Sequence, residues 1–338
     1  MAKLVAEWQK LIATETLQRS SHALAVVGSS AFIFGGELRP REPRDNHVHV
    51  VDLSSEISDN QLSIVSATTN FPSPRVGTAF TSFREKIYMF SGRGGIAMIP
   101  IDERGGLWEF NTTTSTWSLL TPIDTSPQPS ARSYHCLASD GVDRVYLHAG
   151  CPESGRLSDL WLFSVSKRVW TQLESAPDPP RGGASIAFSG GRLYRMHGFD
   201  GKIEQGGILD VYSPDTNSWT SHAYLPDGVS GPTPRSVSAL VALSIGGRPS
   251  LMTLFGEQDP SSLGHAGAGK MSDDQWVYDI ADQRWSQVEI QGDVKPVARG
   301  WLAADVVSRS GSQQVVVSGG LGESNVRLDD VWVLNFYL

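Results

Sequence analysis

The chain has 338 residues, 19% of them charged, and a formal net charge of −8 at pH 7. A surface of that sign repels phosphate backbones, so we expect no nucleic-acid partner. No stretch reaches the ~18 consecutive apolar residues that a membrane helix needs, so we expect no membrane contact either.

The predicted elements start with a strand at residues 5–12, after which one pattern recurs six times. In each repeat an arginine opens a strand of small residues, and a second, β-rich run ends in glycine. The opening arginines are Arg19, Arg75, Arg132, Arg181, Arg235 and Arg299. The closing glycines are Gly36, Gly92, Gly150, Gly198, Gly256 and Gly320. A period close to ~50 residues is typical of kelch repeats.

A third strand follows each closing glycine after a loop of variable length, and the fourth strand usually carries a tryptophan. We expect these tryptophans to fill the space between neighbouring sheets; they are Trp117, Trp170, Trp219 and Trp285. Four antiparallel strands make one propeller blade. The first repeat lacks such a tryptophan, and residues 62–65 are predicted to supply its outer strand.

The last repeat contains only three predicted strands, the third of them near residues 332–334. Trp8 stands in the register of the fourth-strand tryptophans, so residues 5–12 are predicted to complete that blade and remove its open edge. The sequence therefore predicts an all-β fold, a six-bladed kelch β-propeller of four-stranded antiparallel blades, with residues 1–338 as a single domain.

Loops in such a blade alternate between the two faces of the ring, so the loop between strands two and three lies where strand one begins. Most of these loops are longer than a turn requires, and long loops are where binding and catalytic residues usually lie. They span residues 37–47, 93–106, 151–158, 199–206, 257–274 and 321–329. We therefore expect function on this loop face. For the opening arginines, which point the same way, we expect hydrogen bonds to backbone carbonyls between blades.

The loop of the fifth blade places Glu257, Asp259 and His265 within nine residues, among several glycines. Two carboxylates and an imidazole with room for water suit a divalent ion such as Fe(II) or Mn(II). An acidic loop with one histidine is also common as a plain solvated loop. The loop by itself leaves both interpretations open.

Short stretches along nearly the whole chain carry a more specific signal. They are residues 19–28, 34–37, 91–93, 155–157, 181–184, 198–201, 256–269 and 299–301. In these stretches the chain resembles the plant specifier proteins, namely the nitrile-specifier, epithiospecifier and thiocyanate-forming proteins. This resemblance is far more specific than a generic kelch repeat.

The resemblance implies a non-haem Fe(II) site made of glutamate, aspartate and histidine spaced four residues apart. Glu257 and His265 match the outer positions, whereas Ser261 occupies the middle one. A serine hydroxyl is a poor, uncharged ligand, so metal affinity should fall unless Asp259 takes its place.

The resemblance also implies two substrate-contacting arginines and a tryptophan at the mouth of the site. These roles fall on Arg93, Arg156 and Trp301. Guanidinium forks suit a sulfate group, and Trp301 would form an apolar wall. Fe(II) would bind the thiolate sulfur as a Lewis acid while sulfate leaves.

Three functions stay open. The first, favoured by the resemblance, is a small-molecule lyase of secondary metabolism that acts with Fe(II) on a sulfur-containing compound like a glucosinolate aglycone. The second is a kelch interaction module that binds a protein partner, or pairs as a homodimer, through its loop face. The third is a metal-independent isomerase or cyclase that uses the same cup, which Ser261 and the apolar residues 94–100 favour.

Cys136 and Cys151 are the only cysteines of the chain. Two thiols in a chain of this length do not indicate a disulfide framework, so we expect a cytoplasmic protein.

Overall fold

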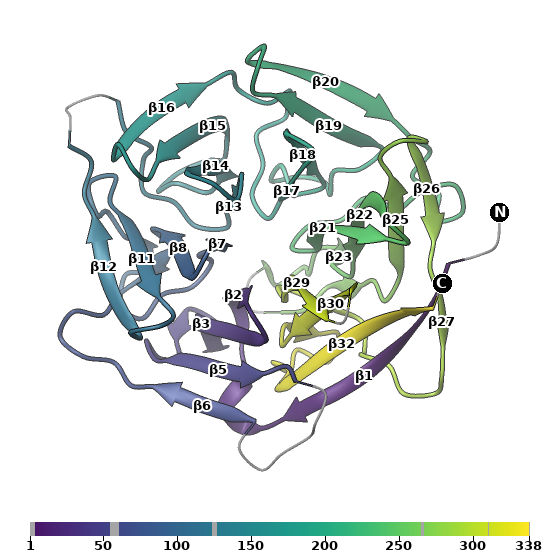
Figure 1. Cartoon of the computed structure of the whole chain (residues 1–338), viewed down its shortest axis with the longest axis horizontal. Coiled ribbons are helices and arrows are strands. Elements are labelled where there is room, and N and C mark those ends of the chain that lie inside the picture. Colours follow the sequence, from purple (N-terminus) through teal and green to yellow (C-terminus); the bar gives the residue numbers. More distant parts are fainter. Residues whose placement is uncertain (1–3, 55–60, 124–126, 265–266, 310, 338) are drawn as a thin grey trace.

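The computed structural model describes residues 4–54, 61–123, 127–264, 267–309 and 311–337. Within these residues, six blades of four strands each stand around a central axis, with the first strand of every blade innermost (Figure 1). The predicted six-bladed propeller with antiparallel blades is confirmed. The single helix among the described residues is the 3-10 turn η1 (Glu15–Leu17), and none found there could cross a membrane.

The first blade is β2 (Ser20–Val27), β3 (Ser30–Arg39), β5 (Val48–Asp52) and β6 (Leu62–Val65), with β4 (Glu42–Pro43) paired to β3. The second is β7 (Phe80–Phe83), β8 (Lys86–Phe90), β11 (Leu107–Asn111) and β12 (Thr116–Leu120). The third is β13 (Cys136–Ser139), β14 (Arg144–Gly150), β15 (Leu157–Ser164) and β16 (Val169–Leu173).

The fourth blade is β17 (Ser185–Ser189), β18 (Arg192–Met196), β19 (Ile208–Ser213) and β20 (Ser218–Ala223). The fifth is β21 (Ala239–Ile245), β22 (Arg248–Leu254), β25 (Gln275–Asp279) and β26 (Arg284–Gln287). The sixth is β29 (Ala303–Arg309), β30 (Ser312–Ser318), β32 (Asp330–Tyr337) and β1 (Val5–Ala13). Short pairs on the loop face are β9 (Arg93–Gly94) with β10 (Ile99–Pro100), β23 (Glu257–Asp259) with β24 (Lys270–Met271), and β28 (Arg299–Gly300) with β31 (Leu321–Gly322).

The ring closes through the two ends of the chain, as predicted. Strand β1 runs antiparallel to β32, from the pair Val5 and Tyr337 to the pair Ala13 and Asp330 (Figure 1). The outer edge of β1 also pairs in parallel with β27 (Glu289–Gln291), a strand that the sequence analysis missed. The N-terminal strand is thus paired with β32 along its length and with β27 at its first three residues, Val5 to Glu7.

The fourth-strand tryptophans pack as expected. Trp117, Trp170 and Trp285 are buried, whereas Trp219 is half-buried. Each indole lies 4.9 to 5.2 Å from an aromatic ring on the third strand of its own blade, measured between ring centroids. Each also lies 5.4 to 6.1 Å from an aromatic ring of the preceding blade. Aromatic contacts of this kind add to the burial of apolar area, so these residues serve the core between blades.

The side chains of the opening arginines bond to backbone carbonyls, as expected, but within their own blade rather than between blades. The link between blades is made by their backbone, because the carbonyl of each opening arginine accepts a hydrogen bond from the N–H of the closing glycine in the preceding blade. In all six, Nη1 donates a hydrogen bond of 2.9 to 3.2 Å to the carbonyl of the residue just before the closing glycine. Five of them also form an ion pair; the partners are Asp45, Glu103, Asp159, Asp274 and Asp330. In the fourth blade the aspartate Asp210 instead pairs with Arg195, at 2.8 Å.

The second residue after each opening arginine belongs to a closed ring of backbone hydrogen bonds, here called the axial ring. Its members are Ser21, Gly77, Tyr134, Gly183, Val237 and Trp301. Each backbone N–H donates to the carbonyl of the member in the preceding blade, and Ser21 donates to Trp301, with all six distances between 2.7 and 3.0 Å. All six residues have positive φ, between 46° and 64°. The axial ring therefore fixes how closely the blades approach the axis.

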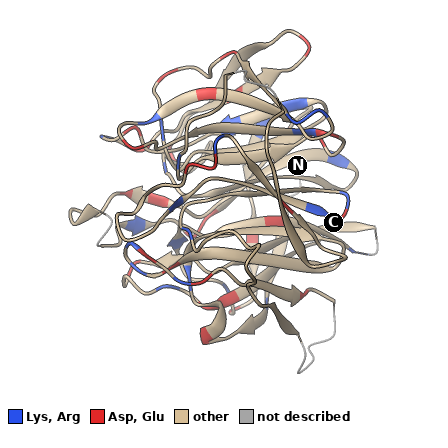
Figure 2. Cartoon of the chain, turned by 90° about the vertical axis from the view of Figure 1, so that its left-hand side faces the viewer, with Lys and Arg blue, Asp and Glu red and all other residues tan. Residues whose placement is uncertain are grey.

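Charged residues of both signs are interspersed along the blades in side view (Figure 2). This distribution agrees with the mixed, net acidic composition of the chain.

Candidate functional site

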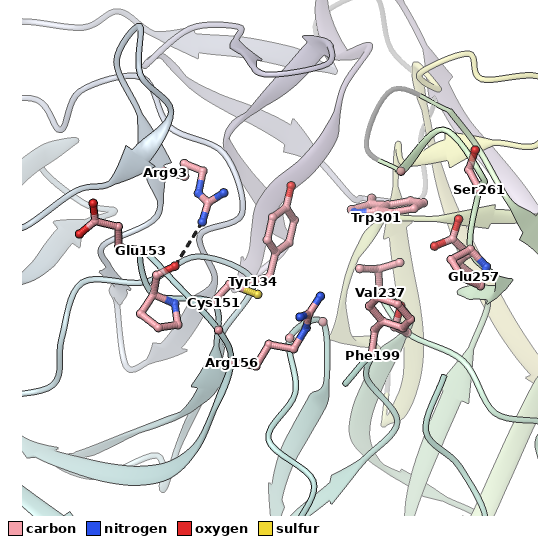
Figure 3. A pocket seen from close by; sticks show the side chains of 17 residues that line it. Arg93, Tyr134, Cys151, Glu153, Arg156, Phe199, Val237, Glu257, Ser261 and Trp301 are labelled. Atoms are coloured by element: carbon pink, nitrogen blue, oxygen red, sulfur yellow. Dashed lines mark hydrogen bonds between the residues drawn. The ribbon is translucent and has the colours of Figure 1, made fainter. Parts of the chain in front are cut away.

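A cavity of about 280 Å³ opens on the loop face, over the centre of the ring (Figure 3). Its walls come from the second to the sixth blade, and its floor includes four members of the axial ring. Among the residues predicted from the sequence, Arg93, Arg156, Glu257, Ser261 and Trp301 all line this cavity. Residues more than 200 positions apart in the chain therefore meet in one site.

Equivalent positions in the repeats explain this convergence. The residue directly after each closing glycine pairs through its backbone with the residue directly after the opening arginine. We call these the rim positions; they are Glu37, Arg93, Cys151, Phe199, Glu257 and Leu321. The four rim residues of the second to fifth blades line the cavity. In the other two blades, Glu37 is bound to Arg327 at 3.0 Å and Leu321 is buried.

Two guanidinium groups face the cavity from the second and third blades (Figure 3). Nη2 of Arg93 donates to the carbonyl of Pro152 at 3.4 Å, and the guanidinium of Arg156 lies 5.0 Å from the centre of the Phe199 ring. Among the described residues neither arginine has a carboxylate partner within ion-pair distance. Both are therefore available to an anionic ligand, whereas the opening arginines are not.

An apolar surface lies across the cavity from Arg93. It is formed by Phe199, Val237 and Trp301, which are seen together in Figure 3. A ligand that contacts both sides must combine a negative charge with an apolar group.

The fifth-blade loop contributes an acidic group with altered proton affinity. Glu257 is only 5% exposed, and its Oε1 accepts a hydrogen bond from the backbone N–H of Gly269 at 3.0 Å. Burial raises the pKa of Glu257 to about 7, because the charged form loses its hydration. Near neutral pH this carboxyl group can therefore accept or release a proton.

The other predicted metal ligands are placed differently. Ser261 lines the cavity, whereas Asp259 is solvent-exposed and its backbone pairs with Lys270. His265 lies outside the described residues. Within the described part of the chain, no three side chains of histidine, cysteine, aspartate or glutamate gather as a metal site would require. One carboxylate and one hydroxyl do not fit Fe(II) by themselves, so we derive no chemical step through an iron ion.

A second buried carboxyl group, Glu204, was missed by the sequence analysis. It is 8% exposed, and its Oε1 accepts a hydrogen bond of 3.2 Å from the hydroxyl of Ser236, which lines the cavity. Burial, and then the charge of Glu257, raise the pKa of Glu204 to about 8. The repeats could have indicated Glu204, because it stands six residues after the closing glycine Gly198, just as the predicted site residue Arg156 stands six residues after Gly150.

Comparison with known proteins places the chain among kelch-repeat propellers. The sequence pattern of the KLHDC2/KLHL20/DRC7 Kelch-repeats domain matches residues 21–256. Among solved structures, the one titled "Structure of YjhT" superposes with a TM-score of 0.70 over 97% of this chain and 99% of that chain, at 14% sequence identity. That similarity concerns the fold alone.

The curated relatives include an enzyme and proteins of other kinds. The chain is 29% identical to N-(sulfonatooxy)prop-2-enimidothioate sulfolyase of Thlaspi arvense, over 93% of this chain and 91% of that protein. This similarity confirms the resemblance to plant specifier proteins. The chain is also 26% identical to the F-box/kelch-repeat protein At1g51550 of Arabidopsis thaliana, over 82% of this chain and 58% of that protein.

Proposed function

The chain belongs to the kelch-repeat family of β-propellers, and we propose that this member is a small-molecule lyase acting on an anionic, sulfur-containing metabolite. The observation that carries the proposal is the cavity itself, where two guanidinium groups without carboxylate partners face an apolar wall and a buried carboxyl group. The similarity to a sulfolyase supports this assignment.

The chemistry follows from the charges. Arg93 and Arg156 bind the anionic group of the substrate and stabilise the negative charge that grows on it as it leaves. The ionised form of Glu257 accepts a proton from the substrate, and the electron pair of that bond forms the new multiple bond while the leaving group departs with its own bonding electrons. General base catalysis of this kind accelerates reactions by roughly 10²–10⁴-fold.

Sulfate is a suitable leaving group for this site. Its oxygens match the planar donors of a guanidinium fork, and its departure needs no protonation because sulfate is a weak base. Trp301 and Val237 then contact the apolar remainder of the substrate. The proposed substrate class is therefore a small metabolite with a sulfate ester at one end and an apolar substituent at the other.

Activity is tested with a thiohydroximate O-sulfate generated in situ, by following sulfate release and the organic products. We expect the wild-type protein to change the product mixture relative to spontaneous decay. The variants Arg93→Ala and Arg156→Ala should lose this effect, whereas Arg144→Ala, which removes an exposed arginine elsewhere, should keep it. A product mixture identical with and without the wild-type protein would refute the proposal for this substrate.

Iron binding is an alternative role for Glu257, which as a metal ligand would not act as the base, and it is tested by metal content. If Glu257 and His265 hold Fe(II) with Ser261 between them, anaerobically reconstituted protein contains about one iron per chain, and Glu257→Ala or His265→Ala removes it. Ser261→Asp restores a charged oxygen ligand at the middle position and should tighten binding. Ser262→Asp adds the same charge at the adjacent, exposed position and serves as the control. Iron-free wild-type and Ser261→Asp proteins would exclude the iron site.

An interaction module is the second candidate, because aliphatic side chains are exposed on loops of the same face. Ile96, Ile203, Leu263 and Val326 come from the loops between strands two and three of four different blades, and all are exposed. Apolar side chains presented by several loops of one face offer a contact surface to a protein partner that bridges those loops. A stoichiometric partner that binds the wild-type protein but not Ile96→Asp would support this function.

A further inference from the structure

The axial ring divides the centre of the propeller into two cavities. We propose that three of its side chains, Tyr134, Val237 and Trp301, form a floor that limits the length of the apolar group that the loop-face cavity accepts. This inference deepens the proposed function and rests on it only for the orientation of the ligand, with the anionic end at the two arginines.

The second cavity lies directly below the first. Its volume is about 180 Å³, and each blade contributes four consecutive residues to its wall, beginning with its member of the axial ring. Tyr134, Gly183, Val237 and Trp301 line both cavities. These residues are therefore the shared wall, and removing a side chain from it would join about 180 Å³ of space to the 280 Å³ above.

Two large side chains of the axial ring, those of Tyr134 and Val237, lie over glycines in the preceding blade. A Cβ atom added at Gly183 would come within 2.8 Å of Cγ1 of Val237, and one added at Gly77 would come within 3.2 Å of the ring of Tyr134. The glycines at these two positions thus make room for the neighbouring side chains. A glycine before each of these two residues lets Tyr134 and Val237 fit over the axis without steric conflict.

The backbone at Val237 shows that this side chain is held against a conformational preference. Its φ is 46°, in a region that β-branched residues rarely adopt. The hydrogen bonds that link Val237 to Gly183 and Trp301, at 2.9 and 3.0 Å, keep it there. A strained residue that lines a cavity is a candidate for a functional role, since a glycine would satisfy the same backbone without strain.

The ligand's direction follows from the walls. Arg93, at its rim position, and Arg156 hold the anionic end, whereas Val237 and Trp301 belong to the axial ring that forms the floor. An apolar part that contacts Val237 and Trp301 therefore points from the arginines toward the floor. Each buried methylene then tightens binding about fourfold until the chain reaches the axial ring. Beyond that length an added methylene gains nothing.

The test uses a series of n-alkyl sulfates from ethyl to decyl, with dissociation constants measured by calorimetry. For the wild-type protein, affinity should rise about fourfold per methylene and then stop rising at a limiting chain length. In Val237→Gly the same rise should continue past that length, because the chain can enter the lower cavity. Val237→Ala, which keeps Cβ, should move the limit less.

Val277→Ala is the matched control, because it removes a buried valine of the same fifth blade that lines neither cavity. Its limiting length should equal that of the wild-type protein, and thermal unfolding checks that all variants are folded. An unchanged limit in both folded Val237 variants would overturn the inference.

The two proposals fail in different ways. If no alkyl sulfate binds to the wild-type protein, the anion site of the proposed function is refuted, together with this inference. If the limiting chain lengths of wild type and variants are as predicted but no sulfated substrate is turned over, the role of the axial ring as a floor is supported and the assignment as a lyase is refuted.

Discussion

The hydroxyl of Ser236 donates a hydrogen bond to the carboxyl group of Glu204 at 3.2 Å, while the backbone of Ser236 exchanges two hydrogen bonds with Glu257. One cavity residue is thus flanked by two buried carboxyl groups from neighbouring blades. Two such groups cannot both ionise without cost, which is why the charge of Glu257 contributes to the raised pKa of Glu204.

Glu204 makes stability depend on pH. The pKa of Glu204 is raised from 4.5 to about 8, so between these values only the folded protein holds the proton, and the free energy of unfolding falls as pH rises. Glu204→Gln has no proton to lose in this range. Its free energy of unfolding, relative to that of the wild-type protein, should therefore rise by on the order of 1–3 kcal/mol between pH 5 and 8. Urea unfolding across this range measures the gain, with the exposed Glu174→Gln as control. A constant difference between Glu204→Gln and wild type would contradict the prediction.

Arg156 should not be replaceable by lysine. A lysine keeps the charge but loses both the planar fork and the stacking on Phe199, which lies 5.0 Å away. We expect Arg156→Lys to weaken binding of hexyl sulfate about tenfold, which corresponds to the loss of one hydrogen bond to a charged group. Calorimetry gives the dissociation constants, and Arg144→Lys at an exposed position should leave them unchanged. Equal affinity in wild type and Arg156→Lys would show that only the charge matters.

The ion pair between Arg132 and Asp159 should stabilise the fold far more than an exposed pair. Arg132 is 1% exposed, and its Nη1 and Nη2 bond to the two carboxylate oxygens at 2.6 and 2.9 Å. Asp159→Asn leaves a buried cation without its counter-charge, so we expect a loss of about 3–5 kcal/mol in the free energy of unfolding.

The comparison for this ion pair is Asp273, whose carboxylate pairs with the exposed Lys295 at 3.2 Å. Asp273→Asn should cost less than about 1 kcal/mol. Similar losses in Asp159→Asn and Asp273→Asn would contradict the structural role of the opening arginines.

Trp8 should hold the ring closed. It is buried beside Phe255, with 5.9 Å between ring centroids, so Trp8→Ala should cost about 3–5 kcal/mol of stability. Loosening β1 also exposes the edge of β32, and exposed edges promote aggregation. Chemical unfolding and light scattering on heating measure both effects. Gln9→Ala, on the exposed side of the same strand, should change neither.

The fold could be predicted because each blade repeats its own local signals. An arginine, a glycine and a tryptophan recur in other blades at the positions of Arg132, Gly150 and Trp170. The arginine and the tryptophan each contact a neighbouring strand of their own blade, through a hydrogen bond and a ring contact respectively. The closure was also predictable, since Trp8 occupies in its strand the position that Trp170 occupies in the fourth strand of the third blade. Strand β27 was missed because its parallel pairing with β1 depends on the path of a connection, which has no repeated signal.

The site could be predicted only in part. Glu257 was found from the composition of its loop and Arg93 only through the family resemblance, although their shared rim position would have indicated both. Asp259 stands two residues after Glu257, which would put both side chains on one face of a regular strand. The register of the pair between β23 and β24 shifts between these residues, and Asp259 is exposed. Such irregularities are not visible in spacing alone.

The pairing of Val5 with Tyr337 has a consequence for engineering the chain. Because the two ends lie side by side on adjacent strands, a tight turn of a few residues would join them into a continuous hairpin. New termini could then be opened in an exposed connection between blades, such as residues 227–230. Such a circular permutant would keep every blade intact, and it would move the site of closure away from the sixth blade.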